Sequence, residues 1–225
     1  MIRYILFDID DTLLNFRDTV DTVISRALAD VGLSFTAEQF AEYHRINGGL
    51  WEQVSAGKLD CNRLYEIRFQ RVLDALGLPA DGTVVEARFR HHLKFIAQPE
   101  EGAAETLAAL SERYVLATAS NAPQKQQEQR LEIGGLAPYF KHILTSGGLG
   151  YDKPSSAFYN ACLRVLGDPP RDEVLMVGDS LSADVRGALN AGIKACWLNT
   201  RRLPVPDDLT VPVVYSLPAL GTLLL

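Results

Sequence analysis

Short apolar runs in this chain alternate with longer segments that have helical periodicity. After residue 100 the helical segments are 101–113, 123–133, 155–166 and 182–190. The apolar runs are the expected strands, and they are Tyr4–Phe7, Tyr114–Ala119, Lys141–Thr145, Val174–Val177 and Lys194–Leu198. Short apolar strands separated by helices of ~10–15 residues are typical of a parallel sheet covered by helices on both faces. The pattern therefore predicts an α/β fold with a doubly wound parallel sheet.

Residues 16–95 interrupt this alternation. They contain few β-branched runs, and glycine or proline at positions 32, 57, 77 and 79 divides them into amphipathic segments. The expected helices are Asp18–Val31, Thr36–Ser55, Asp60–Leu76 and Gly82–Ile96. We expect this block to form a separate α-helical domain, 16–95, inserted as a lid into a core made of 1–15 and 96–225. The apolar tail predicts an edge strand near Val213–Tyr215 and a short last helix.

Composition and charge narrow the function without naming it. The chain has 225 residues, of which 47% are hydrophobic and 22% charged, with a formal net charge of −6 and no basic block. We therefore expect no nucleic-acid or membrane partner. The expected assembly is a monomer or a homodimer. The three cysteines, Cys61, Cys162 and Cys196, are far apart and lack metal-ligand spacing. Free thiols and the absence of a signal-like apolar stretch make the cytoplasm the expected location.

Polar residues follow several of the expected strands. Asp8 and Asp10 come directly after the first strand, where residues two apart share one face. Burying two carboxylates together is unfavourable without a cation or a shared proton. The other polar residues expected at this edge are Ser120, Lys153, Asp179 and Asp184. Ligands bind at the carboxyl ends of parallel strands, and oxygen ligands without His or Cys suit Mg²⁺.

The same residues suggest phosphoryl transfer. One aspartate could attack a phosphoryl group, and Asp10 could protonate the leaving oxygen and later deprotonate water. Lys153 and the Ser120 hydroxyl could then bind the phosphoryl oxygens. Purely structural interpretations remain for single residues. Ser120 and Asn121 could serve as a helix cap alone, and Asp184 could be an ordinary helix residue.

Four motifs resemble those of the haloacid dehalogenase-like hydrolase superfamily. They are FDIDDT, TASN, DKP and GDSLSAD, and they span Phe7 to Asp184 in this order. The resemblance implies a Rossmann-like catalytic core with a helical cap, Asp8 as nucleophile and Asp10 as general acid and base. It also implies Ser120, Asn121 and Lys153 as phosphate ligands. The implied Mg²⁺ ligands are Asp8, the Asp10 carbonyl and Asp179, with Asp184 in the outer shell. Ala-Ser-Asn replaces the Thr-Asn-Gly of many relatives, which leaves the role of Asn121 open.

Asp10 separates the reactions known in this superfamily. Dehalogenases proper lack an acid two residues after the nucleophile, so Asp10 favours a phosphatase. Phosphomutases share this acid, and the core residues alone do not exclude them. Response-regulator receiver domains also combine an acidic Mg²⁺ pocket with Ser/Thr and Lys, but they are shorter and lack an inserted helical domain. A non-catalytic binding protein is disfavoured because every catalytic position is filled.

The helical insertion suggests the substrate. The segment from Tyr43 to Trp51 and the residues around Arg68 resemble the bacterial noncanonical pyrimidine 5′-nucleotidases, as does Cys196–Asn199. This resemblance implies a small phosphate ester as partner, namely a pyrimidine nucleoside 5′-monophosphate. Trp51 or Phe69 could pack on the base, and Asn47 or Arg68 could hydrogen-bond to it, although each could equally be structural. The alternative substrates are sugar phosphates and acylneuraminate phosphates.

Overall fold

The computed structural model describes all 225 residues, and the chain divides into two compact units. The sheet unit consists of Met1–Asn15 and Ala97–Leu225, and the helical unit is Phe16–Ile96. The chain therefore leaves the sheet unit once, shortly after its first strand, and returns to it once. Each unit has its own apolar core, so each is described separately below.

The sheet unit is built on five parallel strands. They are β1 (Tyr4–Phe7), β2 (Val115–Thr118), β3 (Val174–Gly178), β4 (Lys194–Leu198) and β5 (Val213–Val214). Their order is β2-β1-β3-β4-β5, so β1 lies between β2 and β3. The short strands are apolar because helices cover both faces of the sheet and shield it from water. The predicted α/β fold with a parallel sheet is confirmed.

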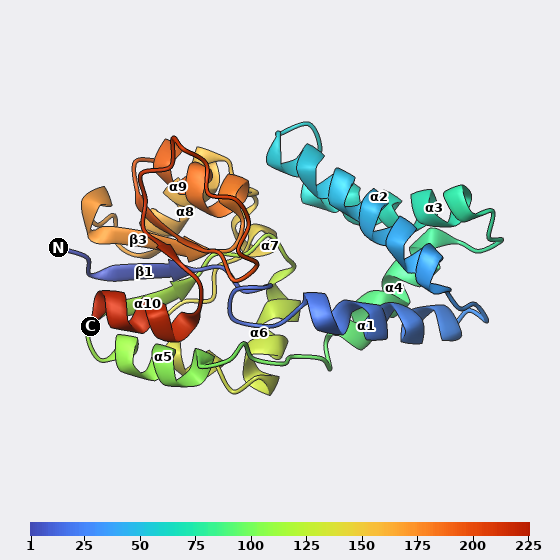
Figure 1. Cartoon of the computed structure of the whole chain (residues 1–225), viewed down its shortest axis with the longest axis horizontal. Coiled ribbons are helices and arrows are strands. Elements are labelled where there is room, and N and C mark those ends of the chain that lie inside the picture. The colour runs from blue at the N-terminus through green and yellow to red at the C-terminus, as the bar shows by residue number, and fades with distance from the viewer. The chain divides into compact units, whose positions relative to one another are not determined.

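Helices cover both faces of this sheet (Figure 1). One face packs against α5 (Ala103–Ser111), α6 (Gln124–Ile133) and α10 (Leu217–Leu224), and the other packs against α8 (Ser156–Val165) and α9 (Gly187–Asn190). A short helix, α7 (Ser146–Leu149), and two 3₁₀ turns, Ala137–Tyr139 and Arg171–Glu173, complete the connections. Because helices cover both faces, the ends of the strands are the part of the sheet where polar side chains can lie together.

Two predicted elements of the sheet unit are wrong in detail. Lys141–Thr145 is not a regular strand but runs beside β2 with isolated bridges at His142 and Thr145. The hydroxyl of Thr118 accepts from the Leu144 N–H at 2.8 Å, so a side chain replaces a ladder carbonyl. The helix expected over 182–190 is instead a π-helical turn, Leu181–Arg186, followed by α9. In this turn the Val185 N–H donates to the Ser180 carbonyl, five residues back.

The helical unit contains four helices. They are α1 (Arg17–Ala29), α2 (Ala37–Ser55), α3 (Cys61–Leu76) and α4 (Gly82–Leu93). Side-chain caps begin three of them: Thr36 forms a capping box with Gln39 before α2, and Asp60 and Asp81 cap α3 and α4. Apolar residues of all four helices, including Tyr43 of α2, form one core. The C-terminal half of α2 and the N-terminal part of α3 form a smaller cluster.

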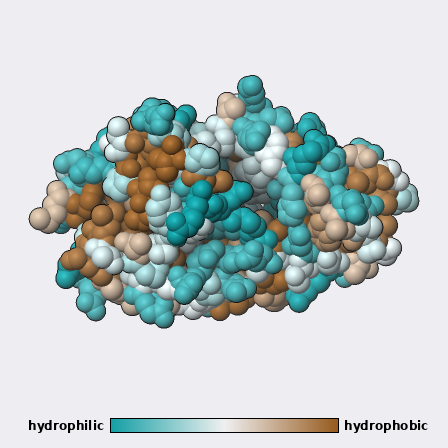
Figure 2. Space-filling view, in the orientation of Figure 1, coloured by the Kyte–Doolittle hydropathy of each residue, from teal (hydrophilic) through white to brown (hydrophobic).

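The surface carries both hydrophilic and apolar residues on the face shown in Figure 2. Large exposed apolar side chains come from separate elements, for example Val84 on α4, Leu189 on α9 and Leu223 on α10. Scattered exposure of this kind is ordinary for a folded domain. None of the helices has the length and apolarity needed to cross a membrane.

Candidate functional site

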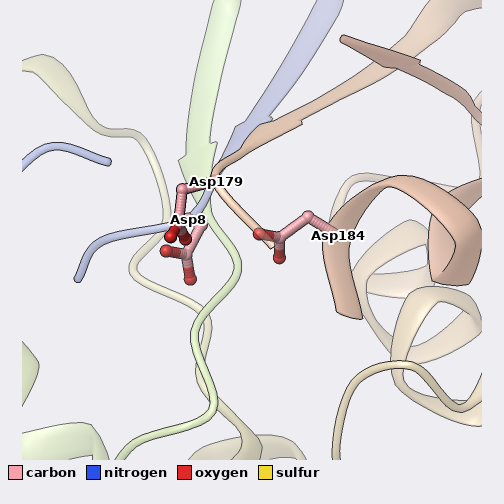
Figure 3. A group of neighbouring side chains, drawn as sticks. All are labelled: Asp8, Asp179 and Asp184. Atoms are coloured by element: carbon pink, nitrogen blue, oxygen red, sulfur yellow. The ribbon is translucent and has the colours of Figure 1, made fainter. Parts of the chain in front are cut away.

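Three aspartates lie together beside the carboxyl ends of the central strands (Figure 3). Asp8 follows β1 and Asp179 follows β3, and these strands are paired in register through Phe7 and Val177. The pairing brings the two aspartates side by side, as expected for parallel strands. Asp184 comes from the π-helical turn, and ligand oxygens of the three aspartates lie within 4.8 Å of one another.

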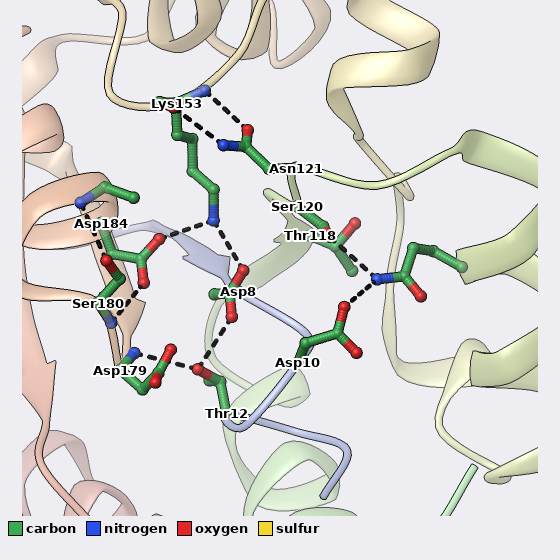
Figure 4. A network of polar contacts seen from close by, with 12 residues as sticks. Asp8, Asp10, Thr12, Thr118, Ser120, Asn121, Lys153, Asp179, Ser180 and Asp184 are labelled. Carbon is green, nitrogen blue, oxygen red and sulfur yellow. Dashed lines mark hydrogen bonds and ion pairs between the residues drawn. The ribbon is translucent and has the colours of Figure 1, made fainter. Parts of the chain in front are cut away.

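A buried lysine joins two of these carboxylates (Figure 4). The Lys153 Nζ donates to Asp8 Oδ1 and to Asp184 Oδ1, each at 2.7 Å. Lys153 and Asp184 are almost completely buried, and Asp8 is 7% exposed. Although burial opposes the lysine charge, Asp184 and Asp8 together raise the pKa of Lys153 above its ordinary value. The lysine is therefore a fixed positive charge at this edge of the sheet.

The cluster carries more negative than positive charge. Burial is the main cause that raises the pKa of Asp8 to about 7, and the Asp184 and Asp10 carboxylates add to the effect while Lys153 opposes it. Burial and the neighbouring Asp8 and Asp184 carboxylates also raise the pKa of Asp179 well above its ordinary value. Three carboxylates facing one ammonium group are unfavourable unless a proton or a cation is added. An all-oxygen donor set of this kind fits Mg²⁺.

The cluster also shows which residues could hold such a cation directly. Both oxygens of Asp184 already accept hydrogen bonds, Oδ1 from Lys153 and Oδ2 from the Ser180 N–H at 2.9 Å. Both oxygens of Asp8 accept as well, Oδ1 from Lys153 and Oδ2 from the Thr12 hydroxyl, so these hydrogen bonds do not rank the candidate ligands. Asp8 and Asp179 directly follow paired strands, whereas Asp184 lies on the π-helical turn. Gly178 makes this packing possible, because a Cβ at this position would lie 2.2 Å from Asp184 Oδ2.

Thr12 connects the loop after β1 to the loop after β3. Its hydroxyl donates to Asp8 Oδ2 at 3.2 Å and accepts from the Asp179 N–H at 3.1 Å (Figure 4). Thr12 is fully buried, so these two bonds are shielded from water. Asp11 follows Asp10 directly and has a φ of 60°. This left-handed conformation turns the chain sharply after Asp10.

Ser120 and Asn121 follow β2, the neighbour of β1. Ser120 is 2% exposed, and its N–H donates to the Leu144 carbonyl at 3.2 Å. The Asn121 side chain forms two hydrogen bonds to the main chain of Lys153: Nδ2 donates to its carbonyl at 2.9 Å, and Oδ1 accepts from its N–H at 2.7 Å. The side chain of Asn121 thus supports the main chain of Lys153, and its role as a phosphate ligand stays a prediction.

Asp10 lies beside two residues that sequence reasoning missed, Gln127 and Arg130 of α6. Arg130 donates to Asp10 Oδ1 at 2.5 Å, and Gln127 donates to Asp10 Oδ2 at 2.8 Å. Gln127 also donates to the Ser120 hydroxyl at 3.0 Å. A signal was present in the sequence, because every residue of α6 except Leu131 and Ile133 is polar. A helix that packs on a core with so few apolar residues must bury polar ones.

Two of the predicted specificity residues belong to the core of the helical unit. Phe69 is 1% exposed and stacks on Tyr43 with ring centroids 5.6 Å apart. Arg68 is 4% exposed and forms two hydrogen bonds with the Glu86 carboxylate, at 2.6 and 3.0 Å. Its guanidinium also lies over Phe89, 4.5 Å from the ring centroid. The polar atoms of Arg68 and the ring of Phe69 therefore already have partners inside the unit, which favours a structural role, and their substrate contacts stay a prediction.

The other two predicted specificity residues are only partly buried. Trp51 packs edge-on against Tyr65 with ring centroids 6.1 Å apart and belongs to the rim of the smaller cluster. Asn47 is half-buried, and its Oδ1 is buried without a hydrogen-bond partner. An unsatisfied buried acceptor is unfavourable. The Asn47 oxygen therefore has an unused hydrogen-bonding capacity, whereas the Arg68 guanidinium already donates to Glu86.

Comparisons with known proteins agree with this arrangement. The haloacid dehalogenase-like hydrolase family matches residues 2–192. The magnesium-bound structure of the HAD-hydrolase YfnB from Bacillus subtilis is 31% identical, with a TM-score of 0.91 over 99% of this chain and 98% of that one.

Two curated relatives are similar over most of their length. The pyrimidine 5′-nucleotidase PynA of Streptococcus pneumoniae is 33% identical over 89% of this chain and 85% of its own. The pyrimidine 5′-nucleotidase YjjG of Escherichia coli is 33% identical over 92% of this chain and 90% of its own. With its parallel sheet and its strand-end aspartates, the chain belongs to the haloacid dehalogenase-like hydrolase family.

Proposed function

We propose that this protein is a Mg²⁺-dependent pyrimidine nucleoside 5′-monophosphatase that acts through an aspartyl-phosphate. Its similarity to two 5′-nucleotidases over about nine-tenths of the chain makes it a phosphoric monoester hydrolase. The observation that carries the mechanism is the buried cluster of Asp8, Lys153, Asp179 and Asp184, in which negative charge exceeds positive charge. Such a cluster is suited to binding a cation and a phosphate together.

The first step would use Asp8 and Asp10. An oxygen of the Asp8 carboxylate attacks phosphorus, the ester P–O bond breaks, and the leaving oxygen takes a proton from Asp10. Lys153 contacts Asp8 directly, so its charge is adjacent to the transferred phosphoryl group, and the Ser120 hydroxyl can donate to a phosphoryl oxygen.

The second step would release the phosphate. Water attacks phosphorus, gives its proton to Asp10, and breaks the bond to Asp8, which leaves inorganic phosphate and free Asp8. The residues that would hold Mg²⁺ are Asp8 and Asp179, with Asp184 supporting them through Lys153 and Ser180. When bound, the ion would neutralise the surplus carboxylate charge and the charge of the substrate phosphate.

The substrate proposal rests on the two relatives and on Asn47. PynA and YjjG are both pyrimidine 5′-nucleotidases, which favours the same class of substrate here. Asn47 has a buried amide oxygen without a partner, and the N–H of a pyrimidine base would satisfy this acceptor if the side chains around it moved to admit the base. Trp51, whose ring is only partly covered, is the second candidate contact.

A phosphate-release assay tests this proposal. Purified protein with Mg²⁺ is assayed with uridylate, thymidylate, purine nucleotides, sugar phosphates and p-nitrophenyl phosphate, before and after metal removal with EDTA. We expect the highest kcat/KM for the pyrimidine nucleotides, loss of activity in EDTA, and recovery with added Mg²⁺. Equal or better hydrolysis of sugar phosphates would overturn the nucleotidase assignment, and full activity without metal would overturn the role of the carboxylate cluster.

A further inference from the structure

Asp10 is held by two side chains of one helix, and one of these, Gln127, also reaches Ser120. Arg130 Nη1 donates to Asp10 Oδ1, and Gln127 Nε2 donates to Asp10 Oδ2. The side chain of Asp10 is 32% exposed, whereas Gln127 and Arg130 are fully buried. The carboxylate is therefore fixed from its buried side, while part of it stays accessible to solvent.

The orientation of the Gln127 amide is set within the same network. Its Oε1 accepts from Arg130 Nη1 at 2.9 Å, so Nε2 is the end that faces Asp10 and Ser120. The two Nε2 hydrogens are then divided between the Asp10 carboxylate and the Ser120 hydroxyl oxygen. Because this bond occupies an acceptor site of Ser120, the hydroxyl hydrogen stays available to donate to another group.

The network connects two loops that are far apart in the sequence. Asp10 follows β1, Ser120 follows β2, and both are joined through residues of α6, which begins at Gln124. Gln127 and Arg130 are three residues apart and lie on the same face of this helix. Burying both completely costs hydration, which their hydrogen bonds to Asp10, Ser120 and each other offset.

We propose that Gln127 and Arg130 are positioning residues for the reaction. They hold the Asp10 carboxylate in the orientation needed for proton transfer, and Gln127 also orients the Ser120 hydroxyl towards the phosphoryl group. This inference rests on the proposed phosphatase function. Small displacements of a catalytic group have large effects on rate, so loss of this support should slow the steps that need Asp10.

The test uses two esters that differ in their need for a proton donor. A nucleoside 5′-monophosphate has an alkoxide leaving group that must be protonated, whereas p-nitrophenyl phosphate releases a stabilised anion. Arg130→Met should lower kcat/KM for the nucleotide by ~10²-fold and for p-nitrophenyl phosphate by less than ~5-fold. Arg130→Lys should restore part of the difference. Gln127→Leu should lower both values, because it also frees Ser120.

Two controls separate positioning from a structural role. Lys125→Met removes an exposed cation from the same helix and should leave both values unchanged. In an Asp10→Asn background, Arg130→Met should change kcat/KM for the nucleotide less than ~2-fold, because the group it positions is absent. The ratio of the two substrates in one preparation is independent of the folded fraction, so partial unfolding does not mask the result.

The outcomes are distinct. Equal losses on both esters in Arg130→Met, or an undiminished loss in the Asp10→Asn background, would overturn the positioning role. A wild-type protein that hydrolyses neither ester would instead overturn the proposed function. A selective loss on the nucleotide, partly recovered by lysine, would support the inference.

Discussion

Each unit of the molecule buries a cluster of charged side chains, and the two clusters are built differently. In the helical unit, Glu86 accepts hydrogen bonds from Arg68 and from Arg90, so one carboxylate faces two guanidinium groups. Aromatic rings lie around the Arg68 guanidinium, whose central carbon is 4.5 Å from the ring centroid of Phe89 and 5.2 Å from that of Phe69. In the sheet unit, Lys153 faces Asp8 and Asp184, and Asp179 adds a third carboxylate.

The difference shows how a buried charge cluster that stabilises the fold can be told from one that binds a ligand. In the helical-unit cluster the buried charges are balanced, because Arg68 and Glu86 form one buried pair while the second cation, Arg90, is 35% exposed and stays hydrated. The sheet-unit cluster has a surplus of negative charge, which raises the pKa of Asp8 to about 7 and that of Asp179 well above its ordinary value. A buried surplus of this kind is typical of functional sites, where a ligand of opposite charge compensates it.

The largest expected effect comes from removing one charge of the sheet-unit cluster. Asp8→Asn should lower phosphate release by ~10⁴-fold or more, because an amide cannot form the phosphorylated intermediate. The variant should remain folded, since the substitution reduces the carboxylate surplus. The checks are steady-state kinetics and thermal unfolding. Activity within tenfold of wild type would exclude Asp8 as the nucleophile.

The second effect concerns the helical-unit cluster and should appear in stability. Arg68→Met removes a buried partner of Glu86, and breaking a buried ion pair costs ~3 kcal/mol or more, partly offset here by Arg90. Hydrogen exchange of α3 and α4 should show the loss as weaker amide protection.

A matched control is available on the same helix. Arg63 pairs with Glu66 on the surface, with both side chains exposed, so Arg63→Met should change protection by less than ~0.5 kcal/mol. If Arg68→Met behaved like Arg63→Met and lowered only activity, Arg68 would be a substrate contact after all.

Much of the sheet unit was predictable from local pattern. Short apolar runs identify buried strands, and the rule that ligands bind at strand ends brings Asp8, Asp179 and Ser120 to one edge. The strand expected over 141–145 failed because a Thr118 side chain takes the place of a ladder carbonyl. Residues 182–190 are helical as expected, but their first part is a π-helical turn, in which the Asp184 carboxylate accepts from the Ser180 N–H and from Lys153.

The specificity residues were harder to predict for a physical reason. Arg68 looks the same in the sequence whether it contacts a substrate or a carboxylate of its own unit. Its partner Glu86 lies 18 residues away on another helix, and periodicity does not reveal which polar residues meet. The same holds for Arg130, whose partner Asp10 lies 120 residues away. Pairing of this kind becomes visible only when the packing of helices is known.

The third expected effect tests the one specificity residue with a free acceptor. Asn47→Ala should lower kcat/KM for uridylate by ~10-fold, about the contribution of one buried hydrogen bond. Hydrolysis of p-nitrophenyl phosphate should barely change, because this ester has no pyrimidine base. Gln53→Ala on the same helix is the control, since the Gln53 amide already donates to the Gly49 carbonyl. Equal losses on both substrates would make Asn47 a structural residue.

The smallest expected effect is a change of stability whose sign depends on the metal. The pKa of Asp179 is raised above its ordinary value of 3.8, so the folded protein binds this proton more tightly than the unfolded chain does. At pH 7 without metal, this carboxyl group is therefore less favourable in the folded protein than in the unfolded chain, and Asp179→Asn should raise the melting temperature by ~2–4 °C. The difference should vanish below the ordinary value, where the carboxyl group is protonated in both states.

Added Mg²⁺ should reverse the order of the two proteins. Wild type should gain stability as the ion concentration exceeds its dissociation constant, by about 2.7 kcal/mol at a hundredfold excess, and Asp179→Asn should gain far less. Thermal unfolding in EDTA and in a Mg²⁺ series measures both parts. If Asp179→Asn destabilised the metal-free protein, or responded to Mg²⁺ as wild type does, the carboxylate cluster would not be a metal site. The sheet-unit cluster would then resemble the helical-unit cluster, whose charges serve the fold alone.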